Sequence, residues 1–250
     1  MRDSLPEPVR RRLDPTARYG LRLTLLAVSL VLVAIPFALL LDQVVRDGPL
    51  TLADTAAAEE LHARVRDSPA LVRALKATTF LGSSAWLAAV VGAAAVHAAG
   101  RRRWRLALFL VATTLVAGAM NAAVKAAVDR DRPSLRPAVA TAGGASFPSG
   151  HAMSSTVAYG AVLLVVLPAL PRRARRPTVA ATGLVVVAIG ASRLALGVHY
   201  VSDVVGGHVL GGAWLAASTA AFSVWRVERG RPPVASLEGL EPEAAGDLRA

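Results

Sequence analysis

The residues of this chain that could do chemistry fall into three short polar clusters, each at the border of a hydrophobic block. They are Lys125–Pro133 (KAAVDRDRP), Pro148–His151 (PSGH) and Ser192–Asp203 (SRLALGVHYVSD). Together the clusters supply cations, two histidines, a carboxylate and a glycine turn. Such a set can bind a phosphate group and attack it with a histidine, provided that all three clusters lie on one face of a membrane.

The third cluster contains the candidate nucleophile. His199 and Asp203 are four residues apart, so on a helix they share a face and can form a hydrogen bond. A carboxylate on one ring nitrogen fixes the tautomer and leaves the other nitrogen free to attack phosphorus. His151 can then protonate the leaving oxygen as a general acid. Taken alone, a His-x-x-x-Asp pair is more often structural, so this interpretation depends on the other clusters.

The remaining polar residues are suited to binding an anion. The Pro-Ser-Gly turn precedes a helix start, where free N–H groups and the helix dipole favour negative charge. Ser149 can donate its hydroxyl, and Gly150 permits close backbone approach. Positive charge comes from Lys125, Arg132 and Arg193. An arginine fork matches two phosphate oxygens at once.

Basic residues at membrane borders commonly do no more than anchor a helix, and we assign that role to Arg130 and Arg136. Arg193 differs because it follows an apolar run and is flanked by Leu194 and Leu196. A charge at the centre of a span costs on the order of 3 kcal/mol, so an arginine near such a position normally has an anionic partner.

A zinc site is disfavoured because the nearby cations would repel the metal. The sequence therefore predicts neither a metal nor a cofactor.

The elements that must position these clusters are apolar blocks. Of the 250 residues, 54% are hydrophobic, and the mean hydropathy is +0.48. Six blocks approach the roughly 20 residues that a helix needs to cross a membrane. They cover residues 23–41, 77–99, 106–124, 151–170, 178–196 and 201–225. Because the blocks are continuous rather than alternating, we predict an all-α integral membrane six-helix bundle over residues 23–225.

The positive charge predicts the orientation of that bundle. Arginines are concentrated in residues 1–22, 101–105, 172–176 and 226–231, which share one side of a six-span topology. That side should be cytoplasmic, so both termini are expected inside and the three clusters outside. The net charge of +11 does not indicate a nucleic-acid partner, because aromatic residues are only 5% and the arginines lie mainly between apolar blocks. The absence of cysteine excludes disulfides and thiolate metal sites.

Three further segments carry predictions of their own. Residues 1–22 form a basic cytoplasmic tail, and the outer connection 42–76 contains a stretch, 52–65, that could form a short surface helix. Residues 226–250 contain glycine, proline and acidic residues with little apolar periodicity, so we expect a disordered cytoplasmic tail. A Gly-x-x-x-Gly step at Gly207 and Gly211 favours close helix packing.

In order and spacing, the three clusters resemble the signature motifs of the type 2 phosphatidic acid phosphatase superfamily, which includes bacterial acid phosphatases and vanadium haloperoxidases. The family patterns are Lys-x6-Arg-Pro, Pro-Ser-Gly-His and Ser-Arg-x5-His-x3-Asp, and each is met without departure. The resemblance covers about residues 77–225, and the six-span plan is similar to the membrane branch of the family.

The resemblance implies a phosphohistidine at His199, oriented by Asp203, with His151 as the acid and then as the base for the incoming water. It implies that no metal is needed, and that the phosphate is held by Lys125, Arg132, Ser149, Gly150 and Arg193.

The expected function is therefore a lipid phosphate or diphosphate phosphatase of the cell membrane, with its site at the outer leaflet. Undecaprenyl diphosphate, phosphatidic acid and phosphatidylglycerol phosphate all fit as substrates, and the sequence does not choose among them or fix the oligomeric state. One alternative is a lipid phosphotransferase that passes the same phosphoryl group to an alcohol. Another is a membrane protein that only binds anions.

Overall fold

The computed structural model describes residues 35, 37–46, 48–232 and 238–249, and all regular structure in these residues is helical. The prediction of an all-α chain is confirmed for this part. Of the first predicted span, 23–41, residues 35 and 37–41 are described and helical. The rest of that span and the basic tail 1–22 lie outside the described residues.

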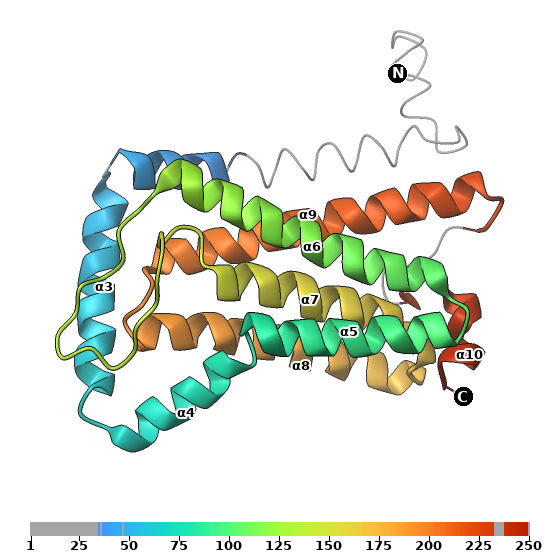
Figure 1. The fold of residues 1–250 in the computed structure, drawn as a ribbon, viewed down its shortest axis with the longest axis horizontal. Coiled ribbons are helices and arrows are strands. Elements are labelled where there is room, and N and C mark those ends of the chain that lie inside the picture. Colours follow the sequence, from blue (N-terminus) through green and yellow to red (C-terminus); the bar gives the residue numbers. More distant parts are fainter. Residues whose placement is uncertain (1–34, 36, 47, 233–237, 250) are drawn as a thin grey trace, which may run out of the picture.

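Five helices run along one common direction and form the bundle (Figure 1). They are α5 (Ser84–Gly100), α6 (Trp104–Val128), α7 (Gly150–Val166), α8 (Arg172–Ala195) and α9 (Val201–Glu228). α6, α8, α9 and α7 with its 3-10 extension η1 (Leu167–Ala169) are each long and apolar enough to cross a membrane. The fifth candidate span joins α4 (Pro69–Phe80) to α5. The described residues thus support four or five of the six predicted spans.

The predicted span over residues 77–99 is not a single straight helix. The chain breaks between α4 and α5, which meet at an angle of 41°. Ser83 caps the new helix, accepting a hydrogen bond from Trp86 N over 3.4 Å. The break also needs Gly82, because a Cβ there would lie 2.5 Å from Ile189 Cγ2. The turn therefore packs closely on α8, and α4 runs at an angle to the helices of the bundle (Figure 1).

The helix predicted over residues 52–65 exists and is longer, as α3 (Pro49–Val65). It lies across one end of the bundle rather than along it (Figure 1). It is more than a surface helix, because Asp54, Ala58, His62 and Val65 are buried. α3 therefore covers the end at which α6 and α8 finish and α7 and α9 begin.

The predicted glycine step brings α7 and α9 into close contact. A Cβ on Gly207 would lie 2.7 Å from Ser149 O, and a Cβ on Gly211 would lie 2.9 Å from Met153 O. At these two positions a side chain would overlap the α7 backbone, so the prediction of close packing is confirmed. The contact fixes the start of α7 against the start of α9.

The prediction of a disordered C-terminal tail does not hold for residues 238–249. This segment contains the short helices η3 (Pro242–Ala244) and α10 (Ala245–Arg249) and covers the end of the bundle opposite α3 (Figure 1). Leu240 N donates to Leu164 O over 3.1 Å, and both Leu240 and Ala244 are buried. The acidic residues that suggested disorder pair with arginines of the bundle, as Glu243 does with Arg226 at 2.7 Å.

Candidate active site

The three polar clusters come together at the bundle end that α3 covers (Figure 1). All eight residues predicted from the sequence are at this end, on the C-terminal parts of α6 and α8, the N-terminal parts of α7 and α9, and the connections between them. Ser149 N donates to Asp203 O over 2.9 Å, and Arg132 donates to Val198 O over 2.8 Å, so direct contacts join the third cluster to the other two. The three clusters thus share one end of the bundle.

His199 is buried in the turn between α8 and α9, at 2% exposure. Its Nδ1 lies 3.2 Å from Asp203 Oδ2, and its Nε2 lies 3.1 Å from an Arg132 guanidinium nitrogen. A guanidinium can only donate, so Nε2 carries the lone pair and Nδ1 carries the proton. The ring therefore presents its unprotonated nitrogen to the cations.

The contact between His199 and Asp203 does not arise in the way that the spacing suggested. α9 begins at Val201, so the histidine precedes the helix instead of sharing a helix face. Asp203 occupies the third helical position and accepts a hydrogen bond from Tyr200 N over 2.8 Å. This is the carboxylate half of a capping box, and it turns the same oxygen toward the histidine.

Burial lowers the pKa of His199 from 6.5 to about 4, although the hydrogen bond and the charge of Asp203 act to raise it. The neighbouring charges of Arg132 and Arg193 add to the lowering. The imidazole is consequently neutral at neutral pH, the form that a nucleophile requires.

Arg193 is a buried cation with spare hydrogen-bonding capacity. It is 7% exposed and donates to Thr79 Oγ1 on α4 over 3.1 Å. Its Nε–H is buried and has no hydrogen-bond partner among the described residues. A buried donor without a partner is costly, so this position is suited to an anion.

Lys125 and Arg132 bind backbone carbonyls rather than carboxylates. Lys125 Nζ donates to Ala145 O over 2.5 Å, and Arg132 donates to the carbonyls of Val198 and Gly144, each over 2.8 Å. Within the described part of the chain, neither residue has a carboxylate in ion-pair distance. Carbonyl groups fix these side chains but leave their full charge for a ligand.

The Pro-Ser-Gly-His turn starts α7 as predicted. Ser149 is the N-cap, and its hydroxyl accepts from Ala152 N over 3.5 Å while its backbone N donates to Asp203 O over 2.9 Å. Gly150 permits a close approach, because a Cβ there would lie 3.3 Å from Asn121 Oδ1. His151 faces the break between α4 and α5, where a Cβ on Gly82 would lie 3.1 Å from the imidazole.

Two polar residues of this site were missed by sequence reasoning. Arg130, which we expected to be a simple anchor, is mostly buried and donates to both Asp203 and Asp54. Ser146 is fully buried and donates its hydroxyl to Asp203. Arg130 stands inside the first cluster and Ser146 two residues before the second, but their roles depend on tertiary contacts that the sequence does not report. Arg136, the other expected anchor, is exposed.

The described residues contain no group of three or more histidine, cysteine, aspartate or glutamate side chains placed to hold a metal ion. The site instead combines two histidines and one carboxylate with several cations. That donor set suits an oxyanion better than a divalent cation.

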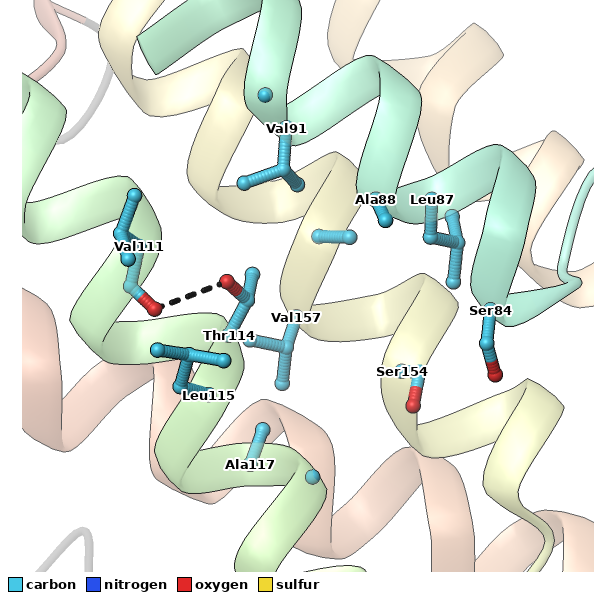
Figure 2. Close-up of a pocket in the computed structure, with 13 residues that line it drawn as sticks. Ser84, Leu87, Ala88, Val91, Val111, Thr114, Leu115, Ala117, Ser154 and Val157 are labelled. Atoms are coloured by element: carbon cyan, nitrogen blue, oxygen red, sulfur yellow. Dashed lines mark hydrogen bonds between the residues drawn. The ribbon is translucent and has the colours of Figure 1, made fainter.

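An apolar groove of about 390 Å³ lies between α5, α6 and α7 (Figure 2). Its walls are formed largely by small and aliphatic side chains, among them Leu87, Val91, Leu115 and Val157. Thr114 donates its hydroxyl to Val111 O over 3.1 Å, the dashed line in Figure 2, which leaves little free polarity on that wall. The groove is thus chemically suited to a hydrocarbon chain.

Two serines lie together at one end of this groove, Ser84 on α5 and Ser154 on α7 (Figure 2). Ser154 is one helical turn after His151, and Ser84 is two residues after Gly82, which approaches the His151 ring. The groove therefore ends near His151.

The arrangement has known counterparts. The model of the family described as the PAP2 superfamily matches residues 105–226. Phosphatidylglycerophosphatase B of Bacillus subtilis is 31% identical over 184 residues, which make up 70% of this chain and 86% of that protein. The chain belongs to the PAP2 superfamily. The resemblance carried by the three motifs is thereby confirmed.

Two further comparisons support the PAP2 assignment. Decaprenylphosphoryl-5-phosphoribose phosphatase of Mycolicibacterium smegmatis is 35% identical over 152 residues, 59% of this chain and 77% of that protein. A crystal structure of a transmembrane PAP2-type phosphatidylglycerolphosphate phosphatase from Bacillus subtilis superposes with a TM-score of 0.71 at 25% identity. That superposition covers 77% of this chain and 94% of the other. This PAP2 protein is thus a multi-pass membrane protein of a phosphatase family.

Proposed function

We propose that this PAP2 protein is a metal-independent lipid phosphate phosphatase of the cell membrane that works through a phosphohistidine at His199. One observation carries the proposal. The buried ring of His199 is neutral, gives its Nδ1 to Asp203 and presents its lone pair on Nε2 to cations that have no carboxylate partner. A purely structural histidine has no need of such cations.

In the first step, the phosphate oxygens occupy the cation cluster and displace Arg132 from Nε2. The nitrogen attacks phosphorus, and the P–O ester bond breaks while His151, which enters this step as the imidazolium, donates its proton to the leaving alcohol. The positive charge that develops on the His199 ring is stabilised by Asp203 at Nδ1.

In the second step, His151 takes a proton from water, and the resulting nucleophile attacks the same phosphorus. The P–N bond breaks, inorganic phosphate leaves, and His199 returns to its neutral form. In both steps the guanidinium and ammonium groups stabilise charge on the equatorial oxygens. The net reaction consumes one ester and one water and produces one alcohol and one phosphate.

The apolar groove supports a lipid as the substrate. A hydrocarbon tail in the groove would place its headgroup at the end marked by Ser84 and Ser154, next to His151, the group that protonates the leaving alcohol (Figure 2). The names of the two relatives also describe phosphatases of lipid phosphates. Phosphatidylglycerol phosphate, phosphatidic acid and undecaprenyl diphosphate are the candidates that we would assay first.

The distribution of arginine supports a site on the outer face. The segments 101–105, 172–176 and 226–231 adjoin the ends of α5, α6, α8 and α9 that point away from the site. Short arginine-rich segments mark the cytoplasmic side of a membrane protein. The polar clusters, at the opposite ends of the same helices, then face outward.

A phosphate-release screen with purified wild-type and His199→Ala protein tests this function. We expect wild type to release phosphate from at least one of the three lipids without an added alcohol acceptor, and His199→Ala to be slower by at least about 10³-fold. Release that requires an acceptor alcohol would favour a phosphotransferase, and no turnover by wild type would favour an anion-binding protein. A chelator should leave the rate unchanged, whereas a loss that zinc restores would contradict metal independence.

A further inference from the structure

Two buried carboxylates at the α3 end share one arginine. Asp54 lies on α3 and Asp203 on α9, and their side chains are 1% and 0% exposed. The Arg130 guanidinium lies between them, 3.0 Å from Asp54 Oδ2 and 2.8 Å from Asp203 Oδ1. Buried charges are costly unless they are paired, so this arrangement fixes the three groups relative to one another.

Ser202 ties α3 to the first turn of α9. Its backbone N donates to Asp54 Oδ1 over 3.0 Å, and its hydroxyl donates to Asp54 Oδ2. The same hydroxyl accepts from Arg130 over 2.7 Å. Because Ser202 is the second residue of α9, its N–H has no acceptor within the helix. Asp54 supplies that acceptor from another element and places negative charge at the positive end of α9.

Asp203 divides its two oxygens between this network and the histidine. Oδ1 accepts from Arg130, whereas Oδ2 accepts from His199 Nδ1 over 3.2 Å, from Tyr200 N over 2.8 Å and from the Ser146 hydroxyl. Arg130 also lies over the Tyr200 ring, with Cζ 4.2 Å from its centroid. Tyr200 N and Ser146 hold Oδ2 directly, and Arg130 fixes the other oxygen of the same carboxylate, so all three orient it toward the imidazole.

We infer that Asp54 and Arg130 are positioning residues for the His199 nucleophile and act on it through Asp203. The inference rests on the proposed role of His199. It makes α3 part of the active site, although the helix belongs to a connection outside all three sequence motifs. Without Arg130, the two carboxylates would face each other with no counter-charge. Without the charge of Asp54, Arg130 would pair with Asp203 alone.

Steady-state kinetics of four variants test the inference. We expect kcat to fall about 30-fold in Arg130→Met and about 10-fold in Asp54→Asn, with KM within about threefold of wild type, because positioning rather than binding is lost. Arg130→Lys should lie between wild type and Arg130→Met, since an ammonium cannot bridge both carboxylates as a guanidinium does. The matched control is Glu60→Gln, which removes the exposed ion pair of the same helix with Arg64 and should change nothing.

A second measurement does not depend on turnover. Titration of His199 by NMR, in protein labelled with ¹⁵N-histidine, reports its environment directly. The charged groups that face His199 are Asp203, Arg132, Arg193 and His151. In Arg130→Met the uncompensated charge of Asp203 should favour the imidazolium and move the titration of His199 to higher pH. In Asp54→Asn, where Arg130 is free to neutralise Asp203, the titration should move to lower pH.

If Asp54 and Arg130 contributed only to stability, both variants would have a lower thermal midpoint, and their His199 titrations would not move apart. Shifts of opposite sign therefore indicate a positioning role. An unchanged kcat in Asp54→Asn, together with unmoved titrations, would overturn the inference. If wild type hydrolyses no lipid phosphate, the proposed function fails, and the titrations still decide the positioning role. If Arg130→Met does not fold, the kinetics and titrations of Asp54→Asn and Arg130→Lys test the positioning role instead.

Discussion

The two ends of the bundle use arginine in opposite ways. At the end covered by α10, Arg103, Arg226 and Arg231 form ion pairs with carboxylates of residues 241–247. At the end covered by α3, Arg132 and Arg193 have no carboxylate in ion-pair distance within the described residues. These three arginines at the α10 end are paired within the chain, whereas at the α3 end Arg130 is paired and Arg132 and Arg193 keep their charge for a ligand.

The same residue type thus serves structure at one end and binding at the other. A paired arginine at the α10 end holds the C-terminal segment against the helices, and the carboxylate partner neutralises its charge. A buried arginine without a carboxylate, such as Arg193, lowers stability until an anion arrives. The α3 end is therefore arranged for an oxyanion, whereas the ion pairs at the α10 end hold residues 238–249 against the bundle.

The largest effect should come from exchanging one arginine at each end for alanine. Arg193→Ala should lower kcat/KM by about 10³-fold, because a positioned cation is lost, while the thermal midpoint stays level or rises. Arg226→Ala should leave kcat/KM within threefold and lower the midpoint by about 3 °C, because its pair with Glu243 is lost. Parallel kinetics and thermal unfolding measure both quantities. Equal losses of activity in the two variants would abolish the distinction between the ends.

Acid should affect the two ends at different pH. His199 has its pKa lowered by burial to about 4, so the neutral ring persists above that pH and kcat/KM should fall as the pH drops through about 4. An unfolded histidine takes up its proton near pH 6.5, so this group also makes the fold less stable as the pH falls from about 6.5 toward 4.

The ion pairs of Glu243 at the α10 end should persist to lower pH. Burial acts to raise the pKa of Glu243, but hydrogen bonds from Arg226 and Arg231 outweigh it and lower the pKa to about 2. Its contribution to stability is fully present above the ordinary value of 4.5 and is lost as the pH falls through about 2. Because the chain has no cysteine, a fluorophore on Gly246→Cys reports release of the tail by anisotropy. Loss of activity and release of the tail at one common pH would contradict the account.

A smaller effect should follow from adding one methyl group at either end. Gly207→Ala places a Cβ 2.7 Å from Ser149 O and should lower kcat/KM about 10-fold, because α7 is pushed away from α9. Gly239 has a φ of +78°, which disfavours a side chain, and a Cβ there would lie 2.6 Å from Leu164 O. Gly239→Ala should therefore loosen only the C-terminal tail and lower the thermal midpoint. Gly212→Ala, with nothing within 4 Å, is the control and should stay within twofold of wild type. A catalytic loss in Gly239→Ala as large as that in Gly207→Ala would show that the ends are not independent.

The sequence predicts the residues that form the site more completely than the residues that hold them in position. Lys125, Arg132 and Arg193 could be identified because the motif spacings are specific. Arg130 could not be distinguished from an anchor, because its role depends on Asp54, which lies 76 residues away in the chain. No local pattern reports such a contact.

The same reasoning explains the errors in the fold. Hydropathy located the bundle helices, but it could not detect the bend at Gly82, which depends on contact with Ile189. The composition of the C-terminal tail suggested disorder because its acidic residues were considered without the arginines that they meet. Apolar periodicity reports burial within one element, whereas ion pairs and bends are set between elements.

Identification of the phosphorylated residue tests the central claim most directly. Wild-type protein would be mixed with ³²P-labelled lipid phosphate, quenched in alkali within one turnover, digested, and analysed by mass spectrometry. We expect a phosphoryl group on Nε2 of His199, and no labelled peptide from His199→Ala. Rapid turnover without a labelled histidine, or a label on His151 instead, would contradict that claim.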